Sequence, residues 1–131
     1  TLATPICDAA QVDNTNVVKV VLDQNDCALY FSRLPIPFER AVVGEPSTAL
    51  RLRHLGIYAY TAQWLLQMAN LPPSPLEQIE KLEQLRALEN GTAIKVLTVE
   101  DVVNIAIDTP EDLVQAELFL EAEGAKRGGS A

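Results

Sequence analysis

Asp108 is a carboxylate at the end of an expected strand, a position that suits a metal ion. It directly follows the apolar residues 102–107, and a carboxylate there is a good ligand for Mg²⁺, which takes one or two protein carboxylates plus phosphate oxygens and water. The acidic opening of the next helix, residues 109–112, offers a second interpretation, in which acids favour the positive end of the helix dipole. Spacing alone leaves both interpretations open.

Glu83 is a carboxylate where a helix should be apolar. Residues 74–90 read as one helix, and at about 100° per residue Glu83 lies at about 340° from Leu76, inside the apolar stripe. Charges are rarely buried without a partner. Glu83 therefore either pairs with Arg86, one turn further on, or faces a pocket that binds something polar.

His54 and Tyr58 lie on one face of an expected strand, residues 52–60. Gly56 leaves a gap between them, and a strand glycine often marks the close approach of a ligand or of backbone. The alternative is a core strand whose histidine and tyrosine have ordinary partners. One histidine without a recognisable partner is weak evidence for a general base.

Two arginines flank a Pro-Ile-Pro turn. Arg33 and Arg40 have the chemistry to hold an anionic substrate, although isolated surface arginines usually bind nothing. The chain shows no Ser/His/Asp motif and no glycine-rich phosphate loop. We therefore expect binding residues but no catalytic nucleophile.

The elements that must position these side chains alternate between strand and helix. Ser74, Pro75 and Glu77 predict a capping box at the start of the 74–90 helix. We expect strands at residues 16–22, 28–32, 52–60, 93–97 and 102–107, a turn at 23–26, and helices at 62–69, 74–90 and 109–123. This order predicts an α/β fold, a mixed sheet with packed helices, in which ligands bind at the carboxyl ends of strands.

Composition narrows the class of protein. The chain has 131 residues, 48% hydrophobic and 21% charged, which fits one globular domain or part of one. The net charge of -8 argues against nucleic-acid binding. No apolar run approaches the ~18 residues of a membrane span, and no signal peptide is present, so a cytoplasmic location is expected.

The cysteines and the histidine bear on metal binding and on the redox state of the thiols. Cys7 and Cys27 form no CxxC motif, and the single His54 rules out a histidine-rich metal site. We interpret both cysteines as buried thiols in a reducing compartment, with a disulfide between them as the alternative.

Five motifs in one order carry a resemblance to a known family. They are Ala-Leu-Tyr-Phe-Ser-Arg (28–33) with Pro-Ile-Pro (35–37) and Arg40, Arg-His-Leu-Gly-Ile-Tyr-Ala-Tyr (53–60), Pro-Ser-Pro-Leu-Glu (73–77), Leu-Glu-Gln-Leu-Arg (82–86) and Asp-Thr-Pro-Glu-Asp-Leu (108–113). Together they closely resemble the C-terminal half of 3-deoxy-manno-octulosonate (KDO) cytidylyltransferase, up to about Glu123. Each motif alone is weak, but five in register are highly specific.

The resemblance implies a reaction and a set of site residues. CTP and KDO give CMP-KDO and pyrophosphate, which activates KDO for lipopolysaccharide biosynthesis. Asp108 matches a carboxylate that helps to bind Mg²⁺, and Arg33 or Arg40 faces the anionic end of the sugar acid. The positions that match the sugar-acid pocket are His54, Tyr58, Glu83 and Gln84. Such transfer depends on positioning and charge neutralisation, so a chain without a catalytic triad fits.

The resemblance also implies a particular organisation. Residues 1–131 would form a single partial domain, the C-terminal half of a Rossmann-like nucleotide-sugar transferase domain, with 124–131 as a disordered tail. The half that grips CTP and holds the other Mg²⁺-binding aspartate would be missing, so we expect the isolated chain to be inactive. The family implies a homodimer, with residues 17–32 as the candidate contact. A non-catalytic dimerisation or regulatory module, or a cytidylyltransferase for a related sugar acid, are the alternatives.

Overall fold

The computed structural model describes residues 1–40, 51–100, 110, 113–114 and 116–121. The chain divides into two compact units, residues 1–101 and 102–131. In the second unit, residues 113–114 and 116–121 are helical, within the helix predicted for 109–123. The strand predicted at 102–107, Asp108 and the predicted tail at 124–131 lie outside the described residues, and the single partial domain stays a prediction.

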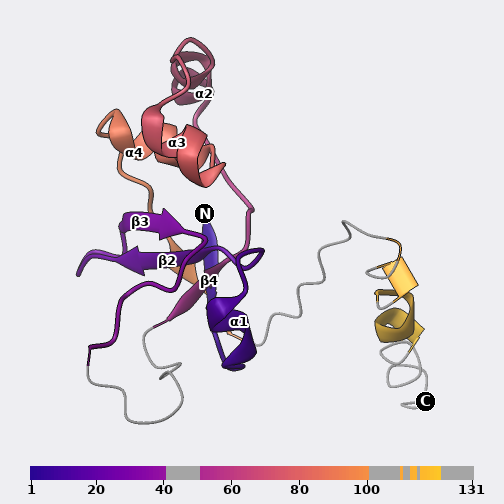
Figure 1. The fold of residues 1–131 in the computed structure, drawn as a ribbon. Helices are drawn as coiled ribbons and strands as arrows, with labels where there is room; N and C mark the ends of the chain where they lie inside the picture. The colour runs from indigo at the N-terminus through magenta and orange to yellow at the C-terminus, as the bar shows by residue number, and fades with distance from the viewer. Residues whose placement is uncertain (41–50, 101–109, 111–112, 115, 122–131) are drawn as a thin grey trace. The chain divides into compact units, whose positions relative to one another are not determined.

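A five-stranded mixed sheet organises the first unit (Figure 1). The strands lie in the order β3-β2-β4-β1-β5. The pair β1–β5 is parallel, and the pairs β1–β4, β2–β4 and β2–β3 are antiparallel. The strands are β1 (Leu2–Pro5), β2 (Lys19–Leu22), β3 (Ala28–Ser32), β4 (Leu52–His54) and β5 (Leu97–Thr98). The prediction of a mixed sheet with packed helices is confirmed.

The hairpin of β2 and β3 follows from local turn chemistry. The Asp23 carboxylate accepts hydrogen bonds from the backbone N–H groups of Asn25 and Cys27, both at 2.8 Å. Asp26 takes a positive φ of 53°, which Asp tolerates better than most residues. The predicted bounds of β3 are confirmed, while β2 begins at Lys19 rather than at residue 16.

Helices α2, α3 and α4 lie on one side of the sheet, away from α1 (Ala10–Asp13) (Figure 1). The predicted bounds of α2 (Ala62–Ala69) are confirmed. Residue 61 caps this helix, since the Thr61 hydroxyl accepts from Trp64 N at 3.2 Å.

The prediction of one helix over residues 74–90 is wrong. The structure has α3 (Pro75–Glu80) and α4 (Gln84–Glu89), separated at Lys81, which takes a left-handed conformation with φ 56°. Contacts with the end of β3 explain the break. The Arg33 guanidinium donates to the carbonyl oxygens of Glu80 (Nε, 2.8 Å) and Lys81 (Nη2, 3.5 Å), which a continuous helix would use internally.

The Glu77 half of the predicted capping box is formed at the start of α3, whereas the Ser74 hydroxyl has no hydrogen-bond partner in the described part of the chain. The Glu77 carboxylate accepts from Ser74 N at 3.0 Å. Pro75 occupies the first helical position, where its missing N–H has no consequence. The start of α3 is therefore set by local sequence, unlike its end.

The strand predicted at 52–60 ends at His54, because Gly56 takes a φ of +67° and turns the chain out of the sheet. Leu55 is buried, but Ile57 is 60% exposed and Ala59 is exposed, so no apolar strand face forms beyond Leu55. The strand predicted at 93–97 is reduced to β5 and an isolated bridge between Lys95 and Cys27.

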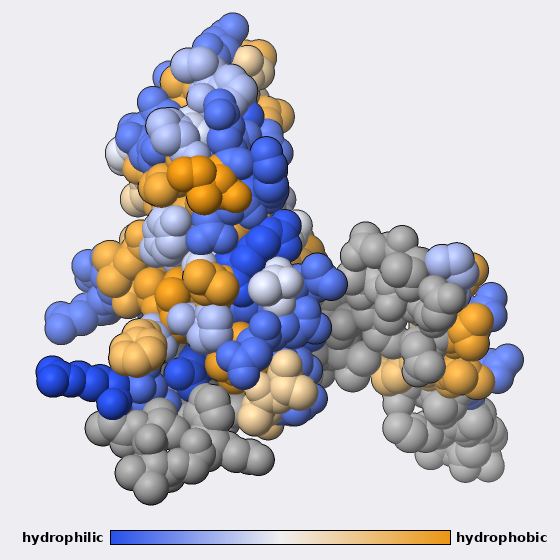
Figure 2. Space-filling view, in the orientation of Figure 1, coloured by the Kyte–Doolittle hydropathy of each residue, from blue (hydrophilic) through white to orange (hydrophobic). Residues whose placement is uncertain are grey.

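The core lies between the sheet and α4. Phe31 and Val20 from the sheet, Leu82 and Leu85 from the α4 region, and Val96 are all buried. Burying such side chains contributes roughly 1.5–3 kcal/mol each. This packing fixes α4 against β3 and so positions the residues at the start of α4. On the face shown in Figure 2, exposed apolar residues appear as separate patches among polar ones.

Lys19 is fully buried, and its charge is satisfied by backbone. The ammonium donates to the carbonyl oxygens of Asn14 (2.9 Å), Val17 (2.6 Å) and Arg33. Desolvation lowers the pKa of Lys19, while Asp13 and Glu80 oppose that shift. The three carbonyl contacts tie the start of β2 to the end of β3.

The interpretation of both cysteines as buried thiols is wrong. Both are free, with Cys7 exposed and Cys27 half-buried. Cys7 follows the end of β1, where the chain leaves the sheet, and Cys27 closes the hairpin turn. The alternative of a disulfide between them is not formed either. Among the described residues, no helix has the length and apolar character needed to cross a membrane.

Candidate functional site

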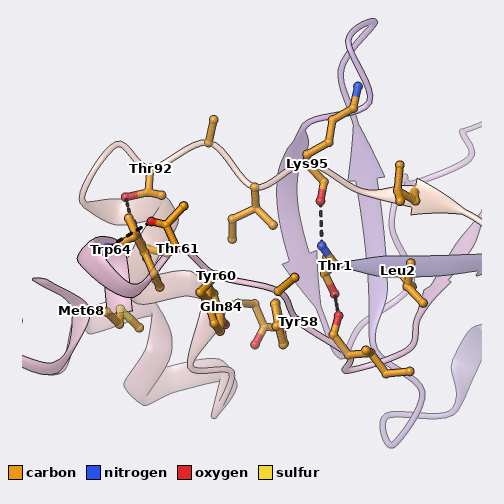
Figure 3. A pocket seen from close by; sticks show the side chains of 16 residues that line it. Thr1, Leu2, Tyr58, Tyr60, Thr61, Trp64, Met68, Gln84, Thr92 and Lys95 are labelled. Carbon is orange, nitrogen blue, oxygen red and sulfur yellow. Dashed lines mark hydrogen bonds between the residues drawn. The ribbon is translucent and has the colours of Figure 1, made fainter. Parts of the chain in front are cut away.

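A pocket of about 580 Å³ opens in the first unit beside the chain that leads from β4 to α2 (Figure 3). Its lining comes from the start of β1, the 57–61 segment, α2, α4 and the segment that leads to β5. The lining side chains used below are Thr1, Tyr58, Tyr60, Trp64, Gln84 and Thr92. Two of these, Tyr58 and Gln84, were predicted from the sequence.

A row of aromatic rings, here called the aromatic wall, runs from His54 to Trp64; Tyr58, Tyr60 and Trp64 line the pocket, and His54 is not among its lining residues. The centroid distances are 5.2 Å from His54 to Tyr58, 5.5 Å from Tyr58 to Tyr60, and 4.8 Å from Tyr60 to Trp64. The last two pairs are stacked, with interplanar angles of 8° and 14°. Trp64 Nε1 donates to the Thr92 hydroxyl at 3.1 Å, which holds the end of the wall in place.

The Tyr58 hydroxyl is buried and has no hydrogen-bond partner in the described part of the chain. Burial raises the pKa of Tyr58, and Tyr60 and Glu83 add to the shift. The phenol is therefore neutral at pH 7 and can donate one hydrogen bond. An orphaned buried hydroxyl is costly, roughly 1–3 kcal/mol, and calls for an explanation. A polar ligand in this pocket provides one.

His54 stands at the end of the aromatic wall nearest the sheet. Its ring lies edge-on to Phe31 at 4.9 Å, and its Nε2 is 2.9 Å from the Thr1 hydroxyl. Burial, with a smaller effect from the N-terminal ammonium, lowers the pKa of His54 to about 4. The imidazole is therefore neutral at pH 7 and acts through hydrogen bonds rather than through charge.

Glu83 does not occupy the position predicted for it. Because the helix breaks at Lys81, Glu83 is the N-cap residue of α4 and is exposed, not part of an apolar stripe. The interpretation of Glu83 as the ion-pair partner of Arg86 is wrong, because Arg86 pairs with Glu77, whose carboxylate accepts from Arg86 Nε at 2.7 Å. Glu83 is nevertheless near the pocket, since its charge raises the pKa of Tyr58 and of Tyr60.

Gln84 follows directly and is buried at the first turn of α4. Its side chain lines the same pocket as Tyr58 and Tyr60 (Figure 3). An amide offers both donors and acceptors, so Gln84 and Tyr58 together present several hydrogen-bonding groups on an otherwise apolar wall.

The arginines are elsewhere. Arg33 contacts backbone, with Nη1 donating to Thr15 O at 3.0 Å in addition to its contacts with the α3–α4 junction. Arg40 is exposed, and neither arginine is among the residues that line the pocket. A role of Arg33 in holding α3 is visible, whereas a role in binding an anion stays a prediction for both.

The described residues hold no group of three or more His, Cys, Asp or Glu side chains that could bind a metal ion. Asp108 lies outside them. The metal site predicted at Asp108 therefore stays a prediction.

Several pocket residues were not singled out from the sequence. Tyr60 and Trp64 carry a weak signal, as the aromatic residues that follow Tyr58 on the way into α2. Thr1 and Thr92 carry none, because their contacts with His54 and Trp64 join residues far apart in the chain.

Comparison with known proteins supplies the family. A family model described as "Cytidylyltransferase" matches residues 1–102, which hold the whole of the pocket. The chain belongs to the cytidylyltransferase family. Cytidylyltransferases are nucleotidyltransferases, and the expectation from the five motifs is confirmed at this level.

Two similar proteins carry the same name, 3-deoxy-manno-octulosonate cytidylyltransferase. The 3-deoxy-manno-octulosonate cytidylyltransferase of Syntrophotalea carbinolica is 50% identical over 125 residues, covering 92% of this chain and 50% of the relative. That of Polynucleobacter necessarius is 52% identical over 120 residues, covering 92% of this chain and 47% of the relative.

A solved structure of CMP:2-keto-3-deoxy-manno-octonic acid synthetase complexed with CTP matches with a TM-score of 0.82 and 37% identity, over 94% of this chain and 48% of that one. The α/β fold class is confirmed by this likeness. The chain spans about half the length of the relatives it matches.

Proposed function

We propose that this chain contributes to a 3-deoxy-manno-octulosonate cytidylyltransferase, which transfers CMP from CTP to KDO and releases pyrophosphate. Within that enzyme, residues 1–131 supply the wall that binds the sugar acid. The relatives that carry this name support the choice of reaction. The chain covers about half of them, so CTP is bound mainly by the other half.

The unpaired Tyr58 hydroxyl supports the proposal that this pocket wall binds the sugar acid. The Tyr58 hydroxyl is a buried donor with no partner among the described residues, and Tyr58 belongs to the lining of a pocket that also holds aromatic rings and the Gln84 amide. A sugar acid has apolar ring faces that pack on aromatic rings and hydroxyl groups that pair with an orphaned phenol. No nucleophile is needed, because transfer to a phosphate depends on position and charge neutralisation.

Tyr58→Phe tests this assignment and separates binding from folding. Removing an unpaired buried hydroxyl should leave the free energy of unfolding unchanged or raise it by up to about 1 kcal/mol. Loss of the hydrogen bond to the ligand should weaken KDO binding by about fivefold to tenfold in calorimetry.

Tyr30→Phe is the matched control, because Tyr30 is half-buried and not among the residues that line the pocket. This control should leave KDO affinity unchanged. Equal KDO affinity for Tyr58→Phe and the unmodified chain would remove Tyr58 from the site.

In this proposal, Glu83 binds the sugar acid and Mg²⁺ serves as a cofactor. The charge of Glu83 acts on Tyr58 and Tyr60, which supports a place for this carboxylate at the pocket rim, where it accepts a sugar hydroxyl. Glu83→Ala should then abolish weak KDO binding. Asp108 would help to hold Mg²⁺, whose chemistry would be to neutralise the phosphates of CTP.

An activity assay tests the expectation that this chain is inactive without the half that binds CTP. We expect no pyrophosphate release from CTP, KDO and Mg²⁺ with the 131-residue chain, since the CTP-binding residues lie elsewhere. Robust turnover by this chain alone would contradict that expectation. A related sugar acid that binds more tightly than KDO in the same calorimetry would redirect the substrate assignment.

A second candidate is a non-catalytic dimerisation module. Exposed apolar side chains favour it, among them Leu29 on β3 (62% exposed) and Leu66 on α2 (69% exposed). A tight dimer with no KDO binding would support this candidate over the first.

A further inference from the structure

The contacts of Thr1 constrain His54 in a way that the proposed function does not require. Thr1 Oγ1 is 2.7 Å from the carbonyl oxygen of Ile57 and 2.9 Å from His54 Nε2. A hydroxyl has one proton to donate, and a carbonyl oxygen can only accept. The Thr1 proton therefore goes to Ile57 O, and Thr1 Oγ1 must accept its second hydrogen bond from His54 Nε2–H.

This geometry sets the tautomer of the imidazole. A neutral imidazole carries a proton on one nitrogen and leaves the other as an acceptor. With Nε2 protonated, Nδ1 is the acceptor, and within the described residues no hydrogen bond reaches Nδ1. The rings of Phe31 and Tyr58 flank the imidazole. The titratable phenol of Tyr58 packs against the imidazole, with 5.2 Å between the ring centroids.

We propose that Thr1 is a positioning residue, which holds His54 as the Nε2–H tautomer and so presents Nδ1 as an acceptor for a hydroxyl of the sugar acid. The identity of the ligand rests on the proposed function, whereas the tautomer rests on the contacts of Thr1 alone. A bare Nδ1 favours a hydroxyl donor and disfavours a carboxylate oxygen, which has no proton to give. Thr1 would thereby help to orient the sugar acid.

Nitrogen NMR of the ¹⁵N-histidine-labelled chain tests the tautomer directly, because His54 is the single histidine. At pH 7 the unmodified chain should show a protonated Nε2 and an unprotonated Nδ1. Thr1→Ser keeps the hydroxyl and should give the same spectrum. Thr1→Val keeps the shape but removes the acceptor, and should lower the ratio of Nε2–H to Nδ1–H by about fivefold to tenfold, the size of one hydrogen bond.

Two results would overturn the role of Thr1. The first is a protonated Nδ1 in the unmodified chain. The second is an unchanged tautomer ratio in a Thr1→Val chain whose amide spectrum remains folded. A purely structural role for Thr1 would lower the thermal midpoint without moving the tautomer ratio, so the two roles are separable.

KDO calorimetry on the same variants tests the link to the ligand. Affinity should fall about fivefold in Thr1→Val and stay unchanged in Thr1→Ser. A shifted tautomer with unchanged KDO affinity would overturn the proposed contact of Nδ1 with the sugar acid. If the unmodified chain binds no KDO, the proposed function fails, while the tautomer measurement still decides whether Thr1 controls His54.

Discussion

His54 and Tyr58 are both kept neutral by burial, and this shapes what the pocket can do. Burial depresses the pKa of the imidazole and raises that of the phenol. Neither group carries charge at pH 7, so under the proposed function the described wall would bind hydroxyl groups and apolar ring surface rather than an anionic group. Binding of an anionic group would need a positive charge from outside this wall. Arg33 and Arg40 remain predicted sources of that charge, although neither lines the pocket.

The depressed pKa of His54 predicts a loss of stability in acid. The unfolded chain protonates near 6.5 and the folded chain near 4, so the unfolded state binds more protons between these values. The free energy of unfolding is therefore highest above pH 6.5 and should fall by up to about 3 kcal/mol as pH falls toward 4. Denaturant unfolding at a series of pH values measures this slope.

His54→Gln is the control for that slope, because it removes the titrating group and keeps a donor near Thr1. Its stability should change little between pH 6.5 and 5, where few carboxylates titrate. An equal slope in both chains would assign the acid sensitivity to other residues.

At the scale of elements, the break between α3 and α4 is the feature that places Gln84 in the pocket. Leu82 and Leu85 are buried against β3, and Arg33 holds the last carbonyl groups of α3. A continuous helix would keep these carbonyl groups internal and would rotate the later residues onto different faces. The break is therefore a product of packing against the sheet.

Lys81→Gly should stabilise the chain. Lys81 has a φ of 56°, which strains a residue with a Cβ and suits glycine, as at the ends of many helices. We expect the free energy of unfolding to rise by about 0.5–1 kcal/mol, measured by denaturant titration. Lys81→Ala, which keeps a Cβ, should bring no such gain.

Gly91→Ala, at the end of α4, should lower the free energy of unfolding, which is the opposite of the effect expected for Lys81→Gly. Gly91 has a φ of +74°, and an added Cβ would meet nothing within 4 Å. Any loss, expected at about 1 kcal/mol, is then due to the backbone conformation alone. A neutral result for both substitutions would mean that neither position is strained in solution.

At the scale of the molecule, β3 is an edge strand among the described strands and exposes Leu29, while its first residue, Ala28, donates to Ile94 O at 2.9 Å. Edge strands present unpaired backbone groups and can join a second chain. This supports the proposal that the 17–32 hairpin, which contains β2 and β3, is the homodimer contact.

Leu29→Glu should weaken a dimer by about tenfold or more, seen as a shift of the sedimentation coefficient toward the monomer at a fixed concentration. Leu66→Glu is matched in size and exposure but lies on α2, and it should leave the dimer intact. The reverse result would move the contact from the hairpin to α2.

The sequence alone identified the elements whose signals are local. The Asp23 turn, β3, α2 and the hydrogen bond from Ser74 N to Glu77 each depend on residues within a few positions of one another. The motif order also led to the right family, because 28–33, 53–60 and 82–86 keep their spacing along the chain. These features required no knowledge of long-range contacts.

Only the tertiary structure decided how the site is assembled. Thr1 meets His54, Thr92 meets Trp64 and Glu77 meets Arg86 through contacts that no periodicity encodes. The helical wheel misplaced Glu83 because contacts from the end of β3 ended α3 early. Local propensity sets where an element can begin, but side chains from distant strands compete for its backbone groups, and that competition fixes which residues face the pocket.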